Sequence, residues 1–106
     1  MQKILKVSFL VFTGIVFTTS FAASNDDVHG AWVYMQRFVE KRLKSPKTAD
    51  FPFGGYRHVT PLKNGRYKVD SYVDSQNSFG ADVRTYFSGV IKKSENGWRL
   101  ESLNFN

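Results

Sequence analysis

The chain has 106 residues, with 15 Lys and Arg against 9 Asp and Glu, and it contains no cysteine. This length suffices for one domain with a small core and leaves no room for a second domain. The absence of cysteine excludes disulfide bonds, thiol chemistry and a lipoprotein-type lipid anchor, so stability must come from packing alone.

The beginning of the chain has the build of a secretory signal peptide. Two lysines precede an uncharged apolar run over residues 7–17, and Ser20 and Ala22 fit the two small positions that a signal peptidase reads. We therefore expect residues 1–22 to form a signal peptide that is cleaved after Ala22. Residues 23–106 would then form a single exported domain.

An uncleaved membrane anchor is the alternative, because no residue between Val7 and Asn25 is charged and this stretch nearly suffices to span a bilayer. Cleavage is favoured because Thr18, Thr19 and Ser20 dilute the apolar run where a membrane helix should continue. We accordingly expect a periplasmic or secreted protein.

The charge of the expected mature chain is mildly positive. Two lysines leave with the signal peptide, so 13 of the 15 basic residues remain against 9 acidic ones, a net charge of +4. The anionic partners within reach of an exported protein are lipid head groups, envelope polysaccharides and acidic proteins. We therefore expect no nucleic-acid ligand, whereas weak binding to anionic surfaces is allowed.

The first element predicted after the signal peptide is an amphipathic helix. Ser24 and Asp27 have the spacing of a capping box. Apolar residues then recur at spacings of three and four, as Val28, Ala31, Trp32, Met35, Phe38, Val39 and Leu43. Gly30 weakens the first turn by about 1 kcal/mol relative to alanine, so either the helix frays there or another segment packs closely against it. Ser45 and Pro46 end the helix.

The rest of the chain predicts a loop and four strands. Residues 44–56 contain two prolines, a glycine pair and two phenylalanines, so we expect a tethered loop whose aromatic rings cover an edge of the core. Beyond it the apolar period changes to two, and three turn signals separate strands expected at 56–62, 66–74, 81–93 and 98–105.

The third and fourth strands carry more detailed expectations. Val83, Phe87 and Ile91 share one face of the third strand, so all three are expected to face the core. In the fourth strand the apolar residues change parity between Leu100 and Leu103, which predicts a bulge near Glu101 and Ser102.

One helix followed by four antiparallel strands buries its apolar stripe most economically by lying across the concave face of the sheet. The sequence therefore predicts a two-layer α+β domain, in which one N-terminal amphipathic helix packs across a four-stranded antiparallel meander in a cystatin-like architecture.

Catalytic groups are sparse in this sequence. His29 and His58 are the only histidines, and a small secreted hydrolase could use His58 with Arg57 or Lys68 for its acid and base steps. His29 falls in the first helical turn and His58 in a strand among solvent-facing residues, which favours structural roles for both. No zinc-ligand spacing, nucleophile elbow or phosphate loop occurs. We expect no enzyme activity, metal or cofactor.

A basic cluster follows the helix: Arg37, Lys41, Arg42, Lys44 and Lys47. Cations at this end complement the helix dipole without any ligand, which favours a solvated cluster. Alternatively, the cluster grips an anionic surface, and the protein is a structural element of the envelope that is held by charge.

The loop between the second and third strands contains an aromatic residue, Phe79. If the loop is structural, Phe79 folds under the sheet as a plug, and we expect this because the third strand extended backwards gives Phe79 the core parity. If the loop recognises a partner, the ring is exposed. In the structural case Asn77 satisfies backbone groups of the loop, and in either case the polar contacts to any partner come from Gln76, Asn77 and Arg84.

Two stretches resemble a bacterial module that is found behind signal peptides or membrane anchors. They are LKSPKTADFP (residues 43–52) and YVDSQNSFGADVRTYF (residues 72–87), followed by WRLESLNF from Trp98. The likeness covers nearly the whole mature chain. The module carries no assigned activity, so the resemblance implies an architecture and an exported location, and it implies no reaction.

The Gln76-to-Gly80 loop is also similar, in its first and last positions, to the Gln-x-Val-x-Gly loop of cystatins, and Trp98 follows a later hairpin turn as their tryptophan does. Ser78 stands where cystatins have valine, and Gly97 stands where they have proline. The resemblance supports the placement of a hairpin loop at these residues more than an inhibitory activity.

The sequence thus predicts a non-enzymatic exported binding module of the bacterial envelope, of an inhibitor or immunity type. It would recognise a protein through loops at one end of the sheet, with Gln76, Asn77, Phe79 and Arg84 as the binding residues. The hydrolase and the charge-held structural protein are the alternatives, and the oligomeric state is left open.

Overall fold

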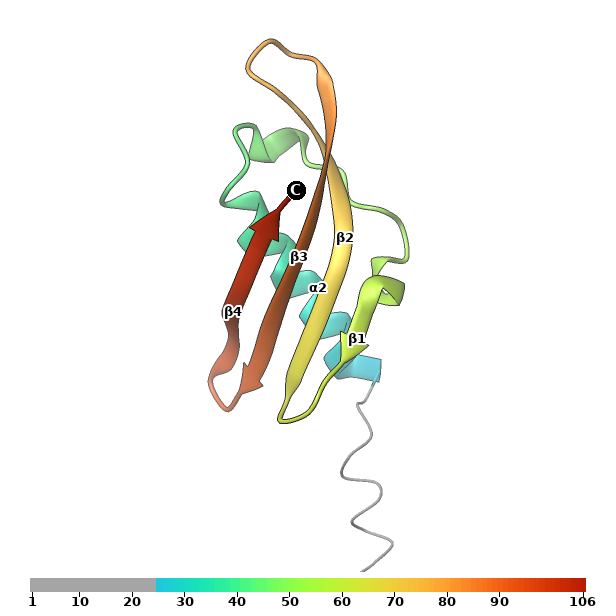
Figure 1. The fold of residues 1–106 in the computed structure, drawn as a ribbon, viewed down its shortest axis with the longest axis vertical. Helices are drawn as coiled ribbons and strands as arrows, with labels where there is room; N and C mark the ends of the chain where they lie inside the picture. Colours follow the sequence, from blue (N-terminus) through green and yellow to red (C-terminus); the bar gives the residue numbers. More distant parts are fainter. Residues whose placement is uncertain (1–24) are drawn as a thin grey trace, which may run out of the picture.

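The computed structural model describes residues 25–106 (Figure 1), so the expected signal peptide, residues 1–22, and the expected cap residue Ser24 lie outside the described residues. One helix packs against a four-stranded antiparallel sheet, which confirms the α+β class. The elements are α2 (Asn25–Glu40), the 3-10 helices η1 (Pro46–Thr48) and η2 (Gly55–His58), and the strands β1 (Val59–Pro61), β2 (Arg66–Gln76), β3 (Asp82–Ser94) and β4 (Gly97–Phe105).

The sheet is a meander with the order β1-β2-β3-β4, and every neighbouring pair is antiparallel. Helix α2 lies across one face and contacts all four strands. The core forms between them from Ala31, Trp32, Met35 and Val39 of the helix and Val59, Tyr67, Val69, Val73, Phe87, Ile91 and Leu103 of the sheet. In the described part of the chain, no helix has the length and apolar character needed to cross a membrane.

Two glycines mark where the helix and the strands approach closely. A Cβ at Gly89 would lie 2.5 Å from the Ser102 carbonyl oxygen and 3.0 Å from Met35 Cε. At Gly30 the Trp98 ring packs so closely that a Cβ would lie 3.0 Å from Cζ2. Of the two explanations for Gly30 in the helix, the close packing of another segment is therefore the correct one.

The helix ends earlier than the apolar stripe predicted. It stops at Glu40, and the following turn is tightened by hydrogen bonds from the Arg42 nitrogen to the Val39 oxygen (2.9 Å) and from the Leu43 nitrogen to the Glu40 oxygen (3.2 Å). Leu43 still packs against the core from outside the helix.

The first strand is shorter than expected. The chain curls into η2 at Gly55, where a Cβ would lie 1.9 Å from the Trp32 ring, so the backbone follows the surface of that ring before β1 begins. Of the two loop phenylalanines, Phe51 packs against the core as predicted, whereas Phe53 is fully exposed.

The bulge that the parity change predicted is present in β4. Val90 pairs with Ser102 and Ile91 with Leu100, so Glu101 is the extra residue. The Glu101 carboxylate accepts a hydrogen bond of 2.6 Å from Arg66 Nε, which lowers the pKa of Glu101.

The hairpin of β2 and β3 extends beyond the other strands. Phe105, at the end of β4, pairs with Phe87, whereas the pairing of β2 with β3 continues as far as Gln76 and Asp82. We call residues 74–84 the arm. Figure 1 shows the arm projecting past the helix and past the end of β4.

Candidate functional site

The tip of the arm is a turn that is closed by backbone hydrogen bonds. The Gly80 nitrogen donates to the Asn77 oxygen (3.0 Å), the Asn77 nitrogen donates to the Ala81 oxygen (2.9 Å), and Gly80 has a φ of 81°. This is the pattern of a three-residue hairpin loop that ends in a left-handed glycine. Asn77 Oδ1 also accepts hydrogen bonds from the backbone nitrogens of Phe79 (2.9 Å) and Ala81 (3.0 Å). Asn77 therefore satisfies loop backbone groups, as predicted.

The expectation that Phe79 folds under the sheet is wrong. Its side chain is 92% exposed. The turn closes within three residues, and the arm carries it beyond the end of α2, so no core surface lies beneath the ring. Val83 was expected in the core with Phe87 and Ile91, but it is 42% exposed, because the arm also carries it beyond the end of α2.

The Arg84 side chain contacts two residues of β2, Asp74 and Tyr72. Its Nε and Nη2 donate to Asp74 Oδ1 (2.8 Å) and Oδ2 (2.9 Å), and its guanidinium carbon lies 4.0 Å from the centre of the Tyr72 ring. The hydrogen bonds with Asp74 raise the pKa of Arg84 and lower that of Asp74. Because Asp74 and Arg84 are directly paired across β2 and β3, this ion pair joins the two strands of the arm.

The structure brings three of the four predicted binding residues to one end of the arm. Gln76, Asn77 and Phe79 are all exposed there, and the Gln76 nitrogen donates to Thr48 Oγ1 (2.9 Å) of η1. Arg84 lies farther along β3 and faces away from the helix, because its parity is opposite to that of the buried Phe87.

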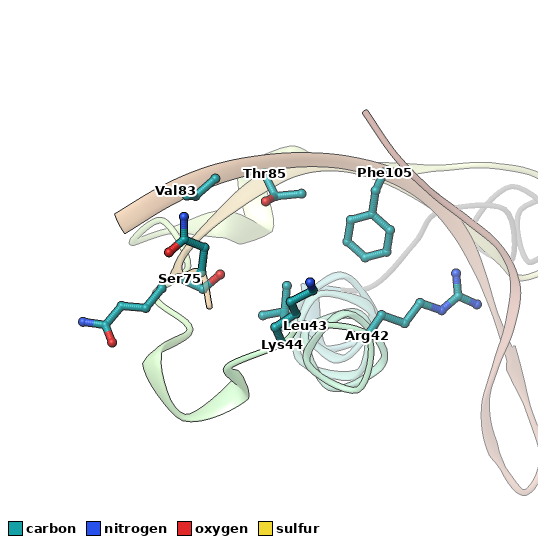
Figure 2. A pocket seen from close by; sticks show the side chains of 9 residues that line it. Arg42, Leu43, Lys44, Ser75, Val83, Thr85 and Phe105 are labelled. Carbon is teal, nitrogen blue, oxygen red and sulfur yellow. The ribbon is translucent and has the colours of Figure 1, made fainter. Parts of the chain in front are cut away.

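A groove of about 250 Å³ lies between the arm and the end of the helix. Figure 2 shows Val83, Thr85 and Phe105 on the sheet, facing Leu43 and Lys44 beyond α2. The remaining lining residues are Arg42, Ser75, Gln76 and Asn77. The sequence did not predict this groove. It forms because the helix ends earlier than its apolar stripe predicted and because the arm extends beyond the end of β4.

Both histidines contact aromatic rings of the protein. His58 Nδ1 lies 2.5 Å from Ser71 Oγ, and the His58 ring contacts the Trp32 ring edge-on at 6.1 Å between centroids. Ser71 is only 7% exposed, which is poorly suited to a nucleophile. His29 packs on Tyr56 with centroids 4.6 Å apart. Among residues 25–106, no group of three His, Cys, Asp or Glu side chains is placed to hold a metal ion.

Several members of the basic cluster have partners within the protein. The Arg37 guanidinium lies 4.7 Å from the centre of the Tyr34 ring, and Lys41 Nζ lies 5.6 Å from that of Phe38. Arg42 Nη1 donates to the Leu103 oxygen at 3.2 Å and so covers part of the outer edge of β4.

Comparison of the chain with protein-family models, with curated proteins and with solved structures found no match. The arm and the groove beside it therefore supply the basis for a functional proposal.

Proposed function

We propose that the protein is a non-enzymatic exported binding module of the bacterial envelope that recognises another protein through the tip of the arm. One observation carries this proposal: Phe79 is 92% exposed on a loop whose backbone is held by four hydrogen bonds, and all four involve Asn77.

This combination favours recognition for two physical reasons. An exposed aromatic ring offers a large apolar surface, and its burial against a partner yields on the order of 1.5–3 kcal/mol. The loop makes these hydrogen bonds within itself, without a partner, which lowers the entropic cost of fixing it on binding.

The shape of the arm favours the inhibitor or immunity type of binding module. A narrow hairpin that projects from the body of a domain can enter a concave site, and enzyme active sites are concave. The partner class that fits best is therefore an exported enzyme whose cleft accepts the ring of Phe79.

The proposal includes a location and a fold type. Export through a signal peptide cleaved after Ala22, to the periplasm or the exterior, is supported by the lysines, the apolar run and the small residues at the start of the sequence. A cystatin-like architecture is supported by the order of one helix followed by a four-stranded meander.

Affinity capture from a periplasmic extract with three forms of the protein tests the proposal. Phe53 is a matched control for Phe79, since it is also a fully exposed phenylalanine but lies in the loop between η1 and η2. We expect the wild type and Phe53→Ala to retain the same partner, and Phe79→Ala to retain at least tenfold less. Either the absence of a reproducible partner or equal retention by Phe79→Ala would refute the proposal.

A further inference from the structure

The arm presents a free backbone edge beside the groove. The Asn106 nitrogen donates to the Tyr86 oxygen (2.9 Å), so the backbone groups of Tyr86 point toward the β4 side of β3. Backbone groups of an antiparallel strand alternate in direction, so those of Asp82 and Arg84 point to the same side. There, the described part of the chain places no strand beside them.

The opposite edge of the arm is covered. Asp50 and Asp74 exchange backbone hydrogen bonds of 2.8 and 3.0 Å, and Thr48 Oγ1 accepts from the Gln76 nitrogen. The free edge of the arm therefore lies on β3 alone, beside the groove that Val83 and Thr85 of the same strand line.

An added strand would direct side chains into the groove. If it continued the line of β4 along β3, its inward-facing residues would follow Phe105 at about 7 Å intervals and lie over Leu43. The volume of about 250 Å³ is below the range of about 300–1,000 Å³ that is typical of small-molecule pockets, so it suits single side chains of a peptide better.

The charge of the groove indicates which kind of peptide fits. Arg42 and Lys44 line it and are both exposed, and no Asp or Glu is among its lining residues. Asp82 is at the far end of the edge, toward the tip of the arm. Acidic side chains of a bound strand would therefore be favoured near the helix end.

We propose that the edge of β3 from Asp82 to Arg84 receives an extended acidic segment of the protein partner by strand addition. The backbone of this segment pairs with β3, its apolar side chains enter the groove, and its carboxylates lie beside Arg42 and Lys44. This inference rests on the proposed function and names the chemistry of the partner segment.

A displayed library of random 12-residue peptides, selected on the full chain, is the probe. We expect the selected peptides to carry apolar and acidic residues two positions apart, because alternate residues of a strand face the same side and both kinds must face the groove. Asp82→Pro removes a free backbone donor and should weaken their binding at least tenfold, whereas Asp82→Ala keeps the donor and should bind them at least as well as the wild type. Lys44→Glu should weaken binding at least tenfold, and the same charge change at Lys47, which does not line the groove, should not.

Amide hydrogen exchange gives a readout on the unmutated protein. When a selected peptide binds, the amides of Asp82 and Arg84 should become protected. Three results of the peptide experiments would overturn the inference: selection of no acidic peptides, selected peptides that bind Asp82→Pro and Lys44→Glu like the wild type, or unchanged exchange at both amides. A dimer in solution that Asp82→Pro dissociates would assign the edge to a second copy of the chain, which also overturns it.

The inference and the proposed function can fail separately. Phe79 is not a lining residue of the groove, so the selected peptides should bind Phe79→Ala as they bind the wild type. If Phe79-dependent capture succeeds and the peptide experiments fail, only strand addition is wrong. If peptides bind the edge but no partner depends on Phe79, only the role of the tip is wrong.

Discussion

Phe79 and Phe87 belong to the same hairpin and have opposite surroundings, with exposed fractions of 92% and 2%. Phe79→Ala should change the free energy of unfolding by no more than about 0.5 kcal/mol, since it removes no buried contact. Phe87→Ala should lower it by about 3–5 kcal/mol because it leaves a cavity between the helix and the sheet. Denaturant melts measure both changes. A loss of 2 kcal/mol or more for Phe79→Ala would mean that the ring is packed.

Asn77 should contribute to stability through its side chain. Oδ1 accepts two backbone hydrogen bonds within the loop, and the loop is exposed, so Asn77→Ala should cost about 1 kcal/mol. Asn77→Asp keeps the acceptor and should stay closer to the wild type. The exposed neighbour Ser78 gives a control in Ser78→Ala. If Asn77→Ala and Ser78→Ala melt alike, the side chain does not hold the loop.

The two close-packed glycines should respond differently to alanine. At Gly89 the added methyl group meets a backbone oxygen at 2.5 Å, so the strands must move apart, at a cost of about 1–3 kcal/mol. At Gly30 it meets only the Trp98 side chain at 3.0 Å, and alanine gains about 1 kcal/mol of helix propensity. Thermal melts should show a clearly larger loss for Gly89→Ala. Equal losses would contradict the close approach at Gly89.

At the scale of the element, the arm depends on an ion pair that titrates with pH. The hydrogen bonds from Arg84 hold the pKa of Asp74 below its unfolded value, so the pair stabilises the folded state above about pH 4 and this contribution is lost as the pH falls through the folded pKa. Glu101 behaves in the same way because of Arg66.

Asp74→Asn removes one of these two contributions. Its melting temperature should therefore fall less than that of the wild type between pH 7 and pH 3, while Glu101 still titrates in both proteins. Parallel melting curves for the two proteins across this range would show that the Asp74–Arg84 pair does not stabilise the arm.

Sequence periodicity predicted the elements where local pattern alone determines them. The parity change between Leu100 and Leu103 predicted a bulge near Glu101 and Ser102, where the structure has it, and the spacing of apolar residues identified the helix and the meander. Periodicity indicates which side a residue faces, but not whether another element lies beneath it. Val83 faces the helix side and is nevertheless exposed, because α2 ends before reaching it.

The other differences also arise from contacts between residues distant in the chain. Gly55 lies against Trp32 within η2, where the sequence predicted the beginning of the first strand, and the groove lies between Leu43 and Val83. The loop residues of the candidate site were predictable from their composition. The groove was not, because it depends on the relative lengths of α2, β4 and the arm.

At the scale of the whole molecule, the two ends of the sheet differ. At one end Asp27 of the helix binds Lys93 Nζ at 2.5 Å and lies 3.5 Å from the Tyr67 hydroxyl group, and Trp98 packs over Gly30. The opposite end carries the arm, the free edge of β3 and the groove. This asymmetry places the proposed partner at the arm end.

Site-specific photo-crosslinking in the cell that produces the protein tests recognition through the tip most directly. A photoreactive phenylalanine analogue at position 79 should give one discrete cross-linked protein species, because the ring would lie against the partner. The same analogue at position 53, which is equally accessible, should give none of that species. No cross-link from position 79, or the same product from both positions, would contradict recognition through the tip of the arm.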